Sequence, residues 1–406
     1  MARRKILALI LAGGKGSRLD VLTEQRAKPA MPFAGTYRLI DFALSNCMHS
    51  GLSDVWVIEQ YRPHSLNDHL ASGRPWDLDR SHGGLRVLPP YQGSDEEGFA
   101  RGNADAIYRH MTFLREFDPD ILLVLSADHL YRMDYMEAID AHLDHRADAT
   151  VVTTEVPLQE AGRFGTVEVD ERSRVTDFRY KPDDPRSGIV TAEIFIYDAP
   201  TLFETLDSLV EEGSGEGMLH DFGDELLPKL VERGRTYAYP LDGYWKDVGT
   251  IESYWGAHMD LLAPTPALAI DDRDWPMLTP GPQRLPARIH RSARIDNSLI
   301  APGCSVAGEV ARSVLAPGVV VEKGAVVRDS VVLAGTVIGA GAHVINAIID
   351  EDVTVGAGAT IGVEGKGGMR VRRERGSAIT VIGRRRTIGA NARVPAGGRM
   401  DPESEE

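Results

Sequence analysis

The sequence is poor in cysteine and in long apolar runs. Its two cysteines, Cys47 and Cys304, stand far apart without metal-ligand spacing, which argues against a disulfide framework or a zinc site. The apolar residues that follow Lys5 extend only to Gly13, too short a stretch for a secretory leader, and no run is long enough to span a bilayer. We therefore expect a reduced, soluble, cytoplasmic protein with no membrane partner.

Positive charge is also in deficit. The chain has 45 Lys and Arg against 60 Asp and Glu, a formal net charge of −15. Such a charge repels polyanions, so nucleic-acid binding is not expected, and an anionic substrate needs a local cluster of cations. The length of 406 residues, with 43% apolar and 26% charged residues, predicts two globular domains or three small ones.

The first part of the chain, residues 1–262, alternates short apolar runs with amphipathic stretches. The runs predict strands at Ile6–Leu11, Asp54–Ile58, Asp120–Leu125, Ala149–Val156 and Ile189–Tyr197. The amphipathic stretches predict helices at Ile40–Ser50, Ala104–Phe117 and Tyr135–Asp144. This alternation predicts an α/β domain with a doubly wound, mostly parallel, Rossmann-like sheet.

The rest of the chain has two further compositions. Residues 263–286 are rich in proline and predict a linker. Within 287–406, apolar residues recur at every sixth position, at Val326, Val332, Ile338 and Val344 and again at Ile349, Val355 and Ile361. A six-residue repeat is typical of a parallel β-helix, although ordinary strands and turns are an alternative. The arginine-rich tail after Gly365 is either a solvated charged run or a site for an effector anion.

Four short segments carry residues suited to phosphate chemistry. A glycine-rich loop from Leu11 to Leu19 follows the first strand, where backbone N–H groups can approach phosphate oxygens, although a structural turn explains the glycines equally well. Its spacing is neither that of a Walker A motif nor that of a dinucleotide fingerprint. Two cations follow in Arg26-Ala27-Lys28-Pro29, where they suit the clamping of displaced phosphates or are ordinary surface residues.

Two aspartates are candidate Mg²⁺ ligands. Asp128 follows the apolar strand that ends at Leu125, at the edge where open α/β sheets bind ligands. Asp247, in Lys246-Asp247-Val248-Gly249, supplies a second hard oxygen donor. The alternatives are a helix N-cap at Asp128 and a plain turn at Asp247.

Together these segments resemble bacterial ADP-glucose pyrophosphorylase, the glucose-1-phosphate adenylyltransferase family, over nearly the whole chain. The resemblance rests on Leu9–Leu19, Arg26–Ala30, Arg38–Cys47, Arg101–Ala106, the blocks at Asp128 and Asp247, and the hexapeptide region. It implies that a nucleoside triphosphate and glucose 1-phosphate react to give an NDP-glucose and diphosphate. It also implies Mg²⁺, a left-handed β-helix and a homotetramer.

The resemblance assigns roles residue by residue. The implied catalytic residues are Arg18, Lys28 and Asp128, and the implied metal ligands are Asp128 and Asp247. We predict nucleotide binding for Leu11, Ala12, Gly13, Gly14, Glu59, Gln60 and Gly102, and sugar-phosphate binding for Gly165, Lys181, Glu193 and Asp247. Glu59 and Glu193 enter these sets for their own chemistry, as departures from the family pattern.

The chain departs from the family pattern at the sugar and at the effector position. The family's Glu-Lys-Pro is Tyr180-Lys181-Pro182 here, and its Ser-Met-Gly is Thr191-Ala192-Glu193, so Glu193 is expected to take over sugar hydroxyl contacts. Glucose stays favoured, with mannose or an amino sugar as alternatives. Gln25 occupies the position of the family's activator-binding lysine, which makes control by a sugar bisphosphate doubtful.

A third departure concerns the base. The family's Thr-Gln-Tyr is Glu59-Gln60-Tyr61 here. A carboxylate accepts hydrogen bonds from guanine N1–H and N2–H₂ but repels the N1 lone pair of adenine, so Glu59 favours GTP over ATP. Alternatively, Glu59 points to solvent and Gln60 faces the base, because side chains alternate along a strand.

Other functions compete with this interpretation. Hexapeptide β-helices occur in acyltransferases, but His343 is the only histidine in the regular stretch of the repeat, between Val326 and Ile361, and has no evident partner. A catalytically dead regulatory subunit is the third hypothesis, and retention of Arg18, Lys28, Asp128 and Asp247 argues against it. The sequence leaves the pathway open, with glycogen synthesis following from ADP-glucose and a trehalose-type glycosyltransferase from GDP-glucose.

Overall fold

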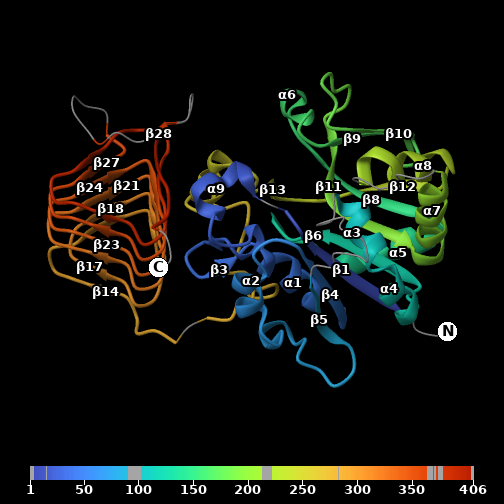
Figure 1. Cartoon of the computed structure of the whole chain (residues 1–406), viewed down its shortest axis with the longest axis horizontal. Helices are drawn as coiled ribbons and strands as arrows, with labels where there is room; N and C mark the ends of the chain where they lie inside the picture. The colour runs from blue at the N-terminus through green and yellow to red at the C-terminus, as the bar shows by residue number, and fades with distance from the viewer. Residues whose placement is uncertain are drawn as a thin grey trace. The chain divides into compact units, whose positions relative to one another are not determined.

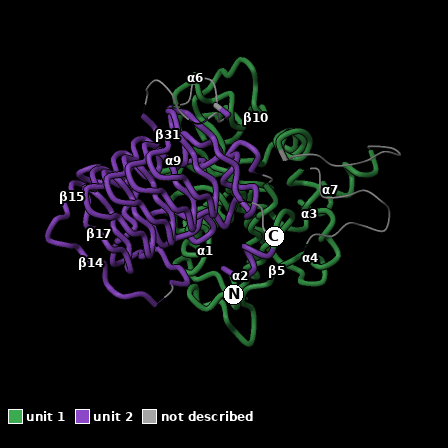
Figure 2. Tube along the Cα trace, turned by 60° about the vertical axis from the view of Figure 1, so that its left-hand side comes forward, with its two compact units in different colours: residues 1–14, 42–63, 70–245 green, residues 15–41, 64–69, 246–406 purple. Residues whose placement is uncertain are grey.

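A computed structural model describes residues 4–14, 16–89, 102–212, 222–281, 283–363, 369, 372–373 and 378–403. The chain forms two compact units, coloured in Figure 2. Unit 1 comprises residues 1–14, 42–63 and 70–245, and unit 2 comprises residues 15–41, 64–69 and 246–406. The segment that carries Arg18 and Lys28 therefore belongs to the same unit as the hexapeptide region. The predicted domain boundaries at 262 and 286 stay a prediction from composition.

Unit 1 is built on a nine-stranded mixed sheet with the main order β10-β9-β11-β6-β1-β4-β5, and β8 pairs with both β11 and β12 (Figure 1). The strands are β1 (Ile6–Ala12), β4 (Asp54–Glu59), β5 (Gly84–Leu88), β6 (Ile121–Ser126), β8 (Ala149–Glu155), β9 (Gly165–Val169), β10 (Val175–Tyr180), β11 (Ile189–Asp198) and β12 (Thr236–Pro240). Strands β6, β1, β4 and β5 run parallel. Strand β11 runs antiparallel to β6, β8 and β9, which the sequence pattern did not indicate.

Both faces of this sheet are covered. Along β1, Leu7 and Leu9 lie on one face and Ala8 and Ile10 on the other, and all four are fully buried. The helices are α1 (Ile40–His49), α3 (Asn103–Arg109), α4 (Met111–Phe117), α5 (Tyr135–His145), α6 (Leu158–Ala161), α7 (Ala199–Glu212) and α8 (Leu227–Glu232). Helix α5 packs on β8, β11 and β12, and α7 packs on β11. The single helix predicted over Ala104–Phe117 is in fact two, because the backbone of His110 leaves helical geometry between α3 and α4.

Unit 2 contains a parallel β-helix of three sheets, which confirms the architecture expected from the six-residue repeat and is consistent with the left-handed type (Figure 1). The first sheet has β14 (Arg288–Ile289), β17 (Ser305–Val306), β20 (Val320–Val321), β23 (Val337–Ile338), β26 (Thr354–Val355) and β30 (Thr387–Ile388). The second has β15 (Arg294–Asp296), β18 (Glu309–Ala311), β21 (Val326–Arg328), β24 (His343–Ile345), β27 (Thr360–Ile361) and β31 (Arg393–Val394). The third has β16 (Leu299–Ile300), β19 (Val314–Leu315), β22 (Val331–Val332), β25 (Ala347–Ile349), β29 (Thr380–Ile382), β32 (Gly398–Met400) and β28 (Arg372–Arg373).

The aliphatic ladder fills the interior of these coils. Val321, Ile338 and Val355 stack in successive coils through the pairs Val321↔Ile338 and Ile338↔Val355, and all three are buried. The ladder predicted from the sequence is one residue out of phase at its start, since Val327 is the buried residue there and Val326 is only half-buried. The reason is that a three-residue strand, β21, leaves a choice of inward position that spacing alone does not fix.

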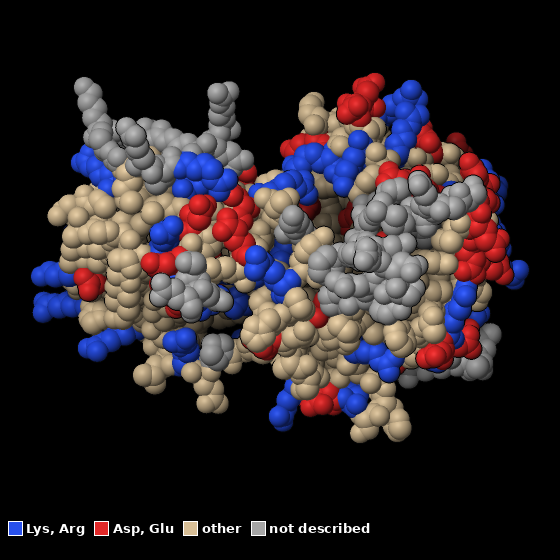
Figure 3. All heavy atoms as spheres, viewed as in Figure 1, with Lys and Arg blue, Asp and Glu red and all other residues tan. Residues whose placement is uncertain are grey.

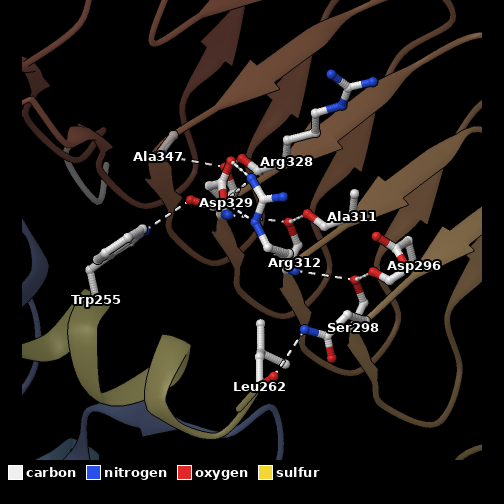
Figure 4. A network of polar contacts seen from close by, with 12 residues as sticks. Trp255, Leu262, Asp296, Ser298, Ala311, Arg312, Arg328, Asp329 and Ala347 are labelled. Carbon is white, nitrogen blue, oxygen red and sulfur yellow. Dashed lines mark hydrogen bonds and ion pairs between the residues drawn. The ribbon is translucent and has the colours of Figure 1, made fainter. Parts of the chain in front are cut away.

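Helix α9 (Ile251–Asp260) is fixed to a corner of the β-helix within unit 2 (Figure 4). The Trp255 indole N–H donates to the Asp329 carbonyl at 2.9 Å, and Arg312 forms two 2.7 Å hydrogen bonds to the Asp329 carboxylate. One coil before Arg312 and two before Asp329, the Asn297 amide donates to the Leu262 carbonyl at 2.9 Å. These bonds fasten the middle of α9 and the residues just beyond its end to the β-helix.

The remaining elements of unit 2 are short. They are the 3-10 segments η1 (Ser17–Thr23) and η2 (Lys28–Ala30), the hairpin β2 (Pro32–Phe33) and β3 (Tyr37–Arg38), and most of α2 (Pro63–Leu70). Between Asp260 and Arg288, the described residues contain no helix or strand. In the part of the chain that the structure describes, no helix has the length and apolar character needed to cross a bilayer.

Candidate functional site

The glycine-rich loop follows β1 at its carboxyl end. Ala12 pairs with Glu59 of β4, so the next residue, Gly13, lies beside the next residue of the other chain segment, Gln60. A Cβ on Gly13 would lie 2.8 Å from the Gln60 side-chain carbon Cδ, so the Gln60 side chain lies directly against this glycine. Gly14 has open space around it, and Gly16 has a left-handed φ of 66°. The backbone here is therefore free to approach a phosphate. Lys15 lies outside the described residues.

The side chain nearest to Gly13 of this loop is that of Gln60. Glu59 is only 1% exposed, so the alternative in which it points to solvent is wrong. The contact between Gln60 and Gly13 instead places the amide of Gln60 beside the predicted nucleotide loop. Gly102 is the N-cap residue of α3, with extended backbone, and Arg101 lies outside the described residues.

Unit 2 brings Arg18, Lys28 and Asp247 together, although they come from distant parts of the sequence. Lys28 Nζ lies 3.6 Å from Asp247 Oδ1, and both side chains are largely buried. A Cβ on Gly249 would lie 2.9 Å from Asp247 Oδ2 and 3.1 Å from a terminal nitrogen of Arg18. Two cations thus lie around one carboxylate, an arrangement that suits the neutralisation of a polyphosphate.

Arg26, by contrast, does not accompany Lys28. Its guanidinium is 2.6 Å from Asp350 Oδ1 and 3.5 Å from Glu351 Oε2, and its side chain is 4% exposed. The suggestion that both cations of Arg26-Ala27-Lys28-Pro29 clamp phosphate is therefore wrong for Arg26.

Asp128 lies just beyond β6, in unit 1. The Ser126 hydroxyl donates to Asp128 Oδ1, and His129 Nε2 lies 3.7 Å from the same oxygen. The next element is the short strand β7 (His129–Tyr131), so the N-cap alternative for Asp128 is wrong. The N-cap of α5 is Asp134, whose carboxylate accepts from the Met136 N–H at 2.9 Å.

The predicted sugar residues lie on β9, β10 and β11 of unit 1. A Cβ on Gly165 would lie 2.8 Å from Phe178 Cζ and 2.9 Å from Thr191 Cγ2, so only glycine fits there. Lys181 Nζ donates to the Tyr180 hydroxyl at 2.5 Å and lies 4.2 Å from the centre of that ring. Tyr180 thus orients Lys181. At the position of Tyr180, the family pattern has a glutamate.

Glu193 lies in a β-bulge of β11, where the pairing with β8 slips between Thr191 and Phe195. Its φ is +57°, a conformation that glycine adopts without strain and that costs other residues ~1 kcal/mol or more. The glycine of the family pattern would suit this backbone. A carboxylate held at a strained bulge near the end of a sheet is typical of functional positions.

Two aromatic side chains that the sequence analysis missed hold this bulge. The Ala192 carbonyl accepts from Trp245 Nε1 at 3.2 Å and from His129 Nδ1 at 3.1 Å. The rings of His129 and Trp245 meet edge to face at 5.2 Å, and Phe164 contacts Trp245 at 5.3 Å. His129 follows Asp128 and Trp245 precedes Lys246 in the sequence, but no spacing linked the two. The clamp connects the Asp128 turn with the strand that carries Glu193.

The tail of the chain is engaged in ion pairs rather than simply solvated. Arg372 pairs with Asp20, Arg384 pairs with Glu351 at 3.2 Å, and Arg399 is buried. Gln25 Nε2 donates to the Glu403 carbonyl at 2.9 Å. Arg370 and Arg375 lie outside the described residues. On the face drawn in Figure 3, basic and acidic side chains of the described residues are interspersed.

Comparisons with known proteins agree with this geometry. The nucleotidyl transferase family model matches residues 7–263, and the GlmU-like C-terminal hexapeptide model matches residues 282–382. A glucose-1-phosphate adenylyltransferase from Thermosipho africanus is 45% identical over 80% of this chain and 78% of its own length. Enzymes of the same name from Thermotoga neapolitana and Clostridium beijerinckii are 46% and 44% identical, over 80% and 81% of this chain and 76% and 85% of their own lengths.

Proposed function

Because the chain belongs to the glucose-1-phosphate adenylyltransferase family and is a sugar-1-phosphate nucleotidylyltransferase, we propose that it joins ATP to glucose 1-phosphate and releases diphosphate and ADP-glucose. The observation that carries the proposal is the cluster of Arg18, Lys28 and Asp247. The sugar phosphate oxygen attacks the α-phosphorus in line, and the protein positions the reactants and neutralises charge without a covalent intermediate. Lys28 and Arg18 stabilise the charge that develops on the departing diphosphate.

Mg²⁺ is the cofactor that the donor set suits. Asp128 and Asp247 offer carboxylate oxygens, the ligands that this hard cation prefers, and Asp128 is left without an N-cap role. When bound, the ion would screen the phosphate oxygens from the incoming sugar phosphate. That both carboxylates serve one ion is a proposal that rests on the family resemblance.

ATP is proposed over GTP, against the expectation drawn from Glu59. The relatives are named adenylyltransferases. Gln60 packs on Gly13, and its neutral amide both donates and accepts, which suits the adenine edge. Glucose is proposed as the sugar because the names of the same relatives specify glucose 1-phosphate. Mannose 1-phosphate and an amino sugar phosphate stay the alternatives because Glu193 and Tyr180 alter the family pattern.

The acyltransferase hypothesis gains no support from His343, which is exposed on β24. A homotetramer and a cytoplasmic location are proposed from the family resemblance. Light scattering that reports a monomer at micromolar concentration would contradict the tetramer.

The proposed reaction is tested by its product. Purified protein incubated with ATP, glucose 1-phosphate and Mg²⁺ should form ADP-glucose, identified by mass spectrometry, with one diphosphate released per product molecule. Lys28→Met should lower kcat by ~100-fold or more, as loss of one charge-stabilising group commonly does. Lys323→Met, at an exposed lysine of the β-helix, should leave the rate unchanged. A wild-type protein that forms no nucleotide sugar would refute the proposal.

A further inference from the structure

A pair of adjacent carboxylates, Asp350 and Glu351, lies in the β-helix directly after β25. Both are buried, at 1% and 8% exposure. Three arginines converge on them. Arg26 lies 2.6 Å from Asp350, Arg38 lies 3.2 Å from Glu351 Oε1, and Arg384 lies 3.2 Å from Glu351 Oε2. Arg26 and Arg38 come from the N-terminal segment 15–41, which also carries Lys28, so this segment is fastened to the β-helix at two points.

Such a cluster is a poor source of stability. Removing charges from water costs free energy that their attraction only partly returns. Burial raises the pKa of Asp350, with Arg26 opposing the shift, whereas for Glu351 burial is outweighed by the three arginines, which lower its pKa. An apolar contact would hold the two segments with less desolvation. The ionic cluster instead fixes the orientation of one segment on the other, because guanidinium and carboxylate groups pair in few geometries.

The chain from Arg26 to Lys28 is stiff. The Ala27 N–H donates to Ser65 Oγ at 3.1 Å. The N–H groups of Ala30 and Met31 donate to the carbonyls of Ala27 and Lys28 at 3.0 Å, and Pro29 restricts the turn between them. A displacement of Arg26 therefore passes to Lys28 rather than being absorbed. Lys28 has little room for such movement, since its buried ammonium lies 3.6 Å from Asp247.

The far end of the segment is fixed in the same way. Leu39 donates to the Met31 carbonyl at 3.2 Å, the Arg38 N–H donates to Asp41 Oδ2 at 2.8 Å, and Arg38 reaches back to Glu351. The stretch between Arg26 and Arg38 is thus a loop whose ends are anchored on adjacent carboxylates, Arg26 on Asp350 and Glu351 and Arg38 on Glu351.

We propose that Asp350 and Glu351 are positioning residues of the transferase reaction, which hold Lys28 in its reactive place through Arg26. The β-helix then contributes to catalysis itself. The inference rests on the proposed function, because it requires that Lys28 stabilises the transition state. Misplacement of a reacting group by about 1 Å can cost ~100-fold in rate, so the effect is expected in kcat rather than in substrate binding.

The test is a double-mutant cycle between Lys28 and Asp350, measured on the full-length protein. Asp350→Asn should lower kcat by tenfold or more and change KM for ATP and glucose 1-phosphate less than threefold. In a Lys28→Ala background, the same substitution should change kcat less than twofold, because there is no longer a lysine to place. An Asp350→Asn variant with wild-type kcat, or one whose loss of kcat is undiminished in the Lys28→Ala background, would overturn the inference.

Two further variants keep the test decisive. Glu309→Gln removes an exposed ion pair with Arg328 on the β-helix and should leave kcat unchanged, which separates general weakening of the β-helix from positioning. If Asp350→Asn does not fold, Glu351→Gln, which keeps the shape of the side chain, is judged by the same criteria. Lys28→Ala with wild-type kcat would instead refute the catalytic role of Lys28, and the inference would fall with it while the transferase activity stands.

Discussion

The ammonium of Lys28 lies 3.6 Å from the carboxylate of Asp247, and both side chains are largely buried. Neither the spacing nor the local pattern of the sequence links the two residues. Their contact balances charge, because a buried cation needs a nearby anion and a buried carboxylate needs a nearby cation. The arrangement fits a site whose charge is balanced when a polyphosphate is bound.

The role of Asp128 is tested against that of Asp134, six residues further on. Asp128→Asn should lower kcat by ~100-fold or more, ~3 kcal/mol, because a ligand charge is lost while Ser126 can still donate to the side chain. Asp134→Ala removes the N-cap of α5 and should cost ~1 kcal/mol of stability with activity retained. Steady-state kinetics and urea unfolding of both variants measure the contrast. More than a tenth of wild-type activity in Asp128→Asn would make it a bystander.

Glu193 is predicted to trade stability for sugar recognition. Glu193→Gly should raise the free energy of unfolding by ~1 kcal/mol, because glycine relieves the φ of +57°. Glu193→Ala removes the carboxylate but keeps a Cβ in the strained region, so it should not gain that stability. Both variants should change the ratio of kcat/KM between glucose 1-phosphate and other sugar phosphates. An unchanged ratio in both would show that the carboxylate does not contact the sugar.

Stability should fall in mild acid because of His258. Burial lowers the pKa of His258 to about 4 from 6.5, with only a small opposing effect of its hydrogen bond to the Tyr254 carbonyl. Its other nitrogen accepts from the Ala34 N–H at 3.2 Å, which requires a neutral ring. As pH falls from 6.5 towards 4, the unfolded state takes up a proton that the folded state refuses, so up to ~3 kcal/mol of stability is lost.

The acid effect is measured as the slope of the melting temperature against pH. His258→Gln should flatten the slope between pH 6.5 and 4, whereas His64→Gln, at an exposed side chain, should leave it as in the wild type. Part of the slope should survive in His258→Gln, because burial also lowers the pKa of His142 to about 4. A wild-type protein with a flat slope over this range would contradict a neutral, buried His258.

Two glycines of the β-helix separate backbone strain from steric clash. Both Gly341 and Gly362 have left-handed φ, of 68° and 78°. The Cβ added by Gly341→Ala would have no atom within 4 Å, so this substitution should lower stability by ~1 kcal/mol, from backbone strain alone. A Cβ at Gly362 would lie 1.8 Å from the Ile345 carbonyl oxygen, so Gly362→Ala should cost several times more. Equal melting temperatures of the two variants would mean that the coils shift freely at Gly362.

Periodicity predicted the parts of the fold that repeat. The six-residue ladder identified the β-helix, and the apolar runs identified β1, β4, β6, β8 and β11 to within about two residues. What it missed depends on contacts between distant residues. The antiparallel direction of β11, its bulge at Glu193 and the clamp of Trp245 and His129 on Ala192 leave no periodic trace. Motif chemistry identified Lys28 and Asp247, but their proximity, and the capture of Arg26 by Asp350, needed the fold.

Residue chemistry and family membership disagree about the nucleotide base, because the Glu59 carboxylate favours guanine whereas the relatives are named adenylyltransferases. The preferred base therefore tests the central claim, that the protein makes ADP-glucose. Steady-state kcat/KM should be measured for ATP and GTP with glucose 1-phosphate and Mg²⁺, in the wild type and in Glu59→Thr and Gln60→Ala. We predict that the wild type prefers ATP by at least tenfold, that Gln60→Ala lowers this ratio, and that Glu59→Thr leaves it within threefold. A wild type that uses GTP best, with the preference lost in Glu59→Thr, would contradict the account and make the protein a guanylyltransferase.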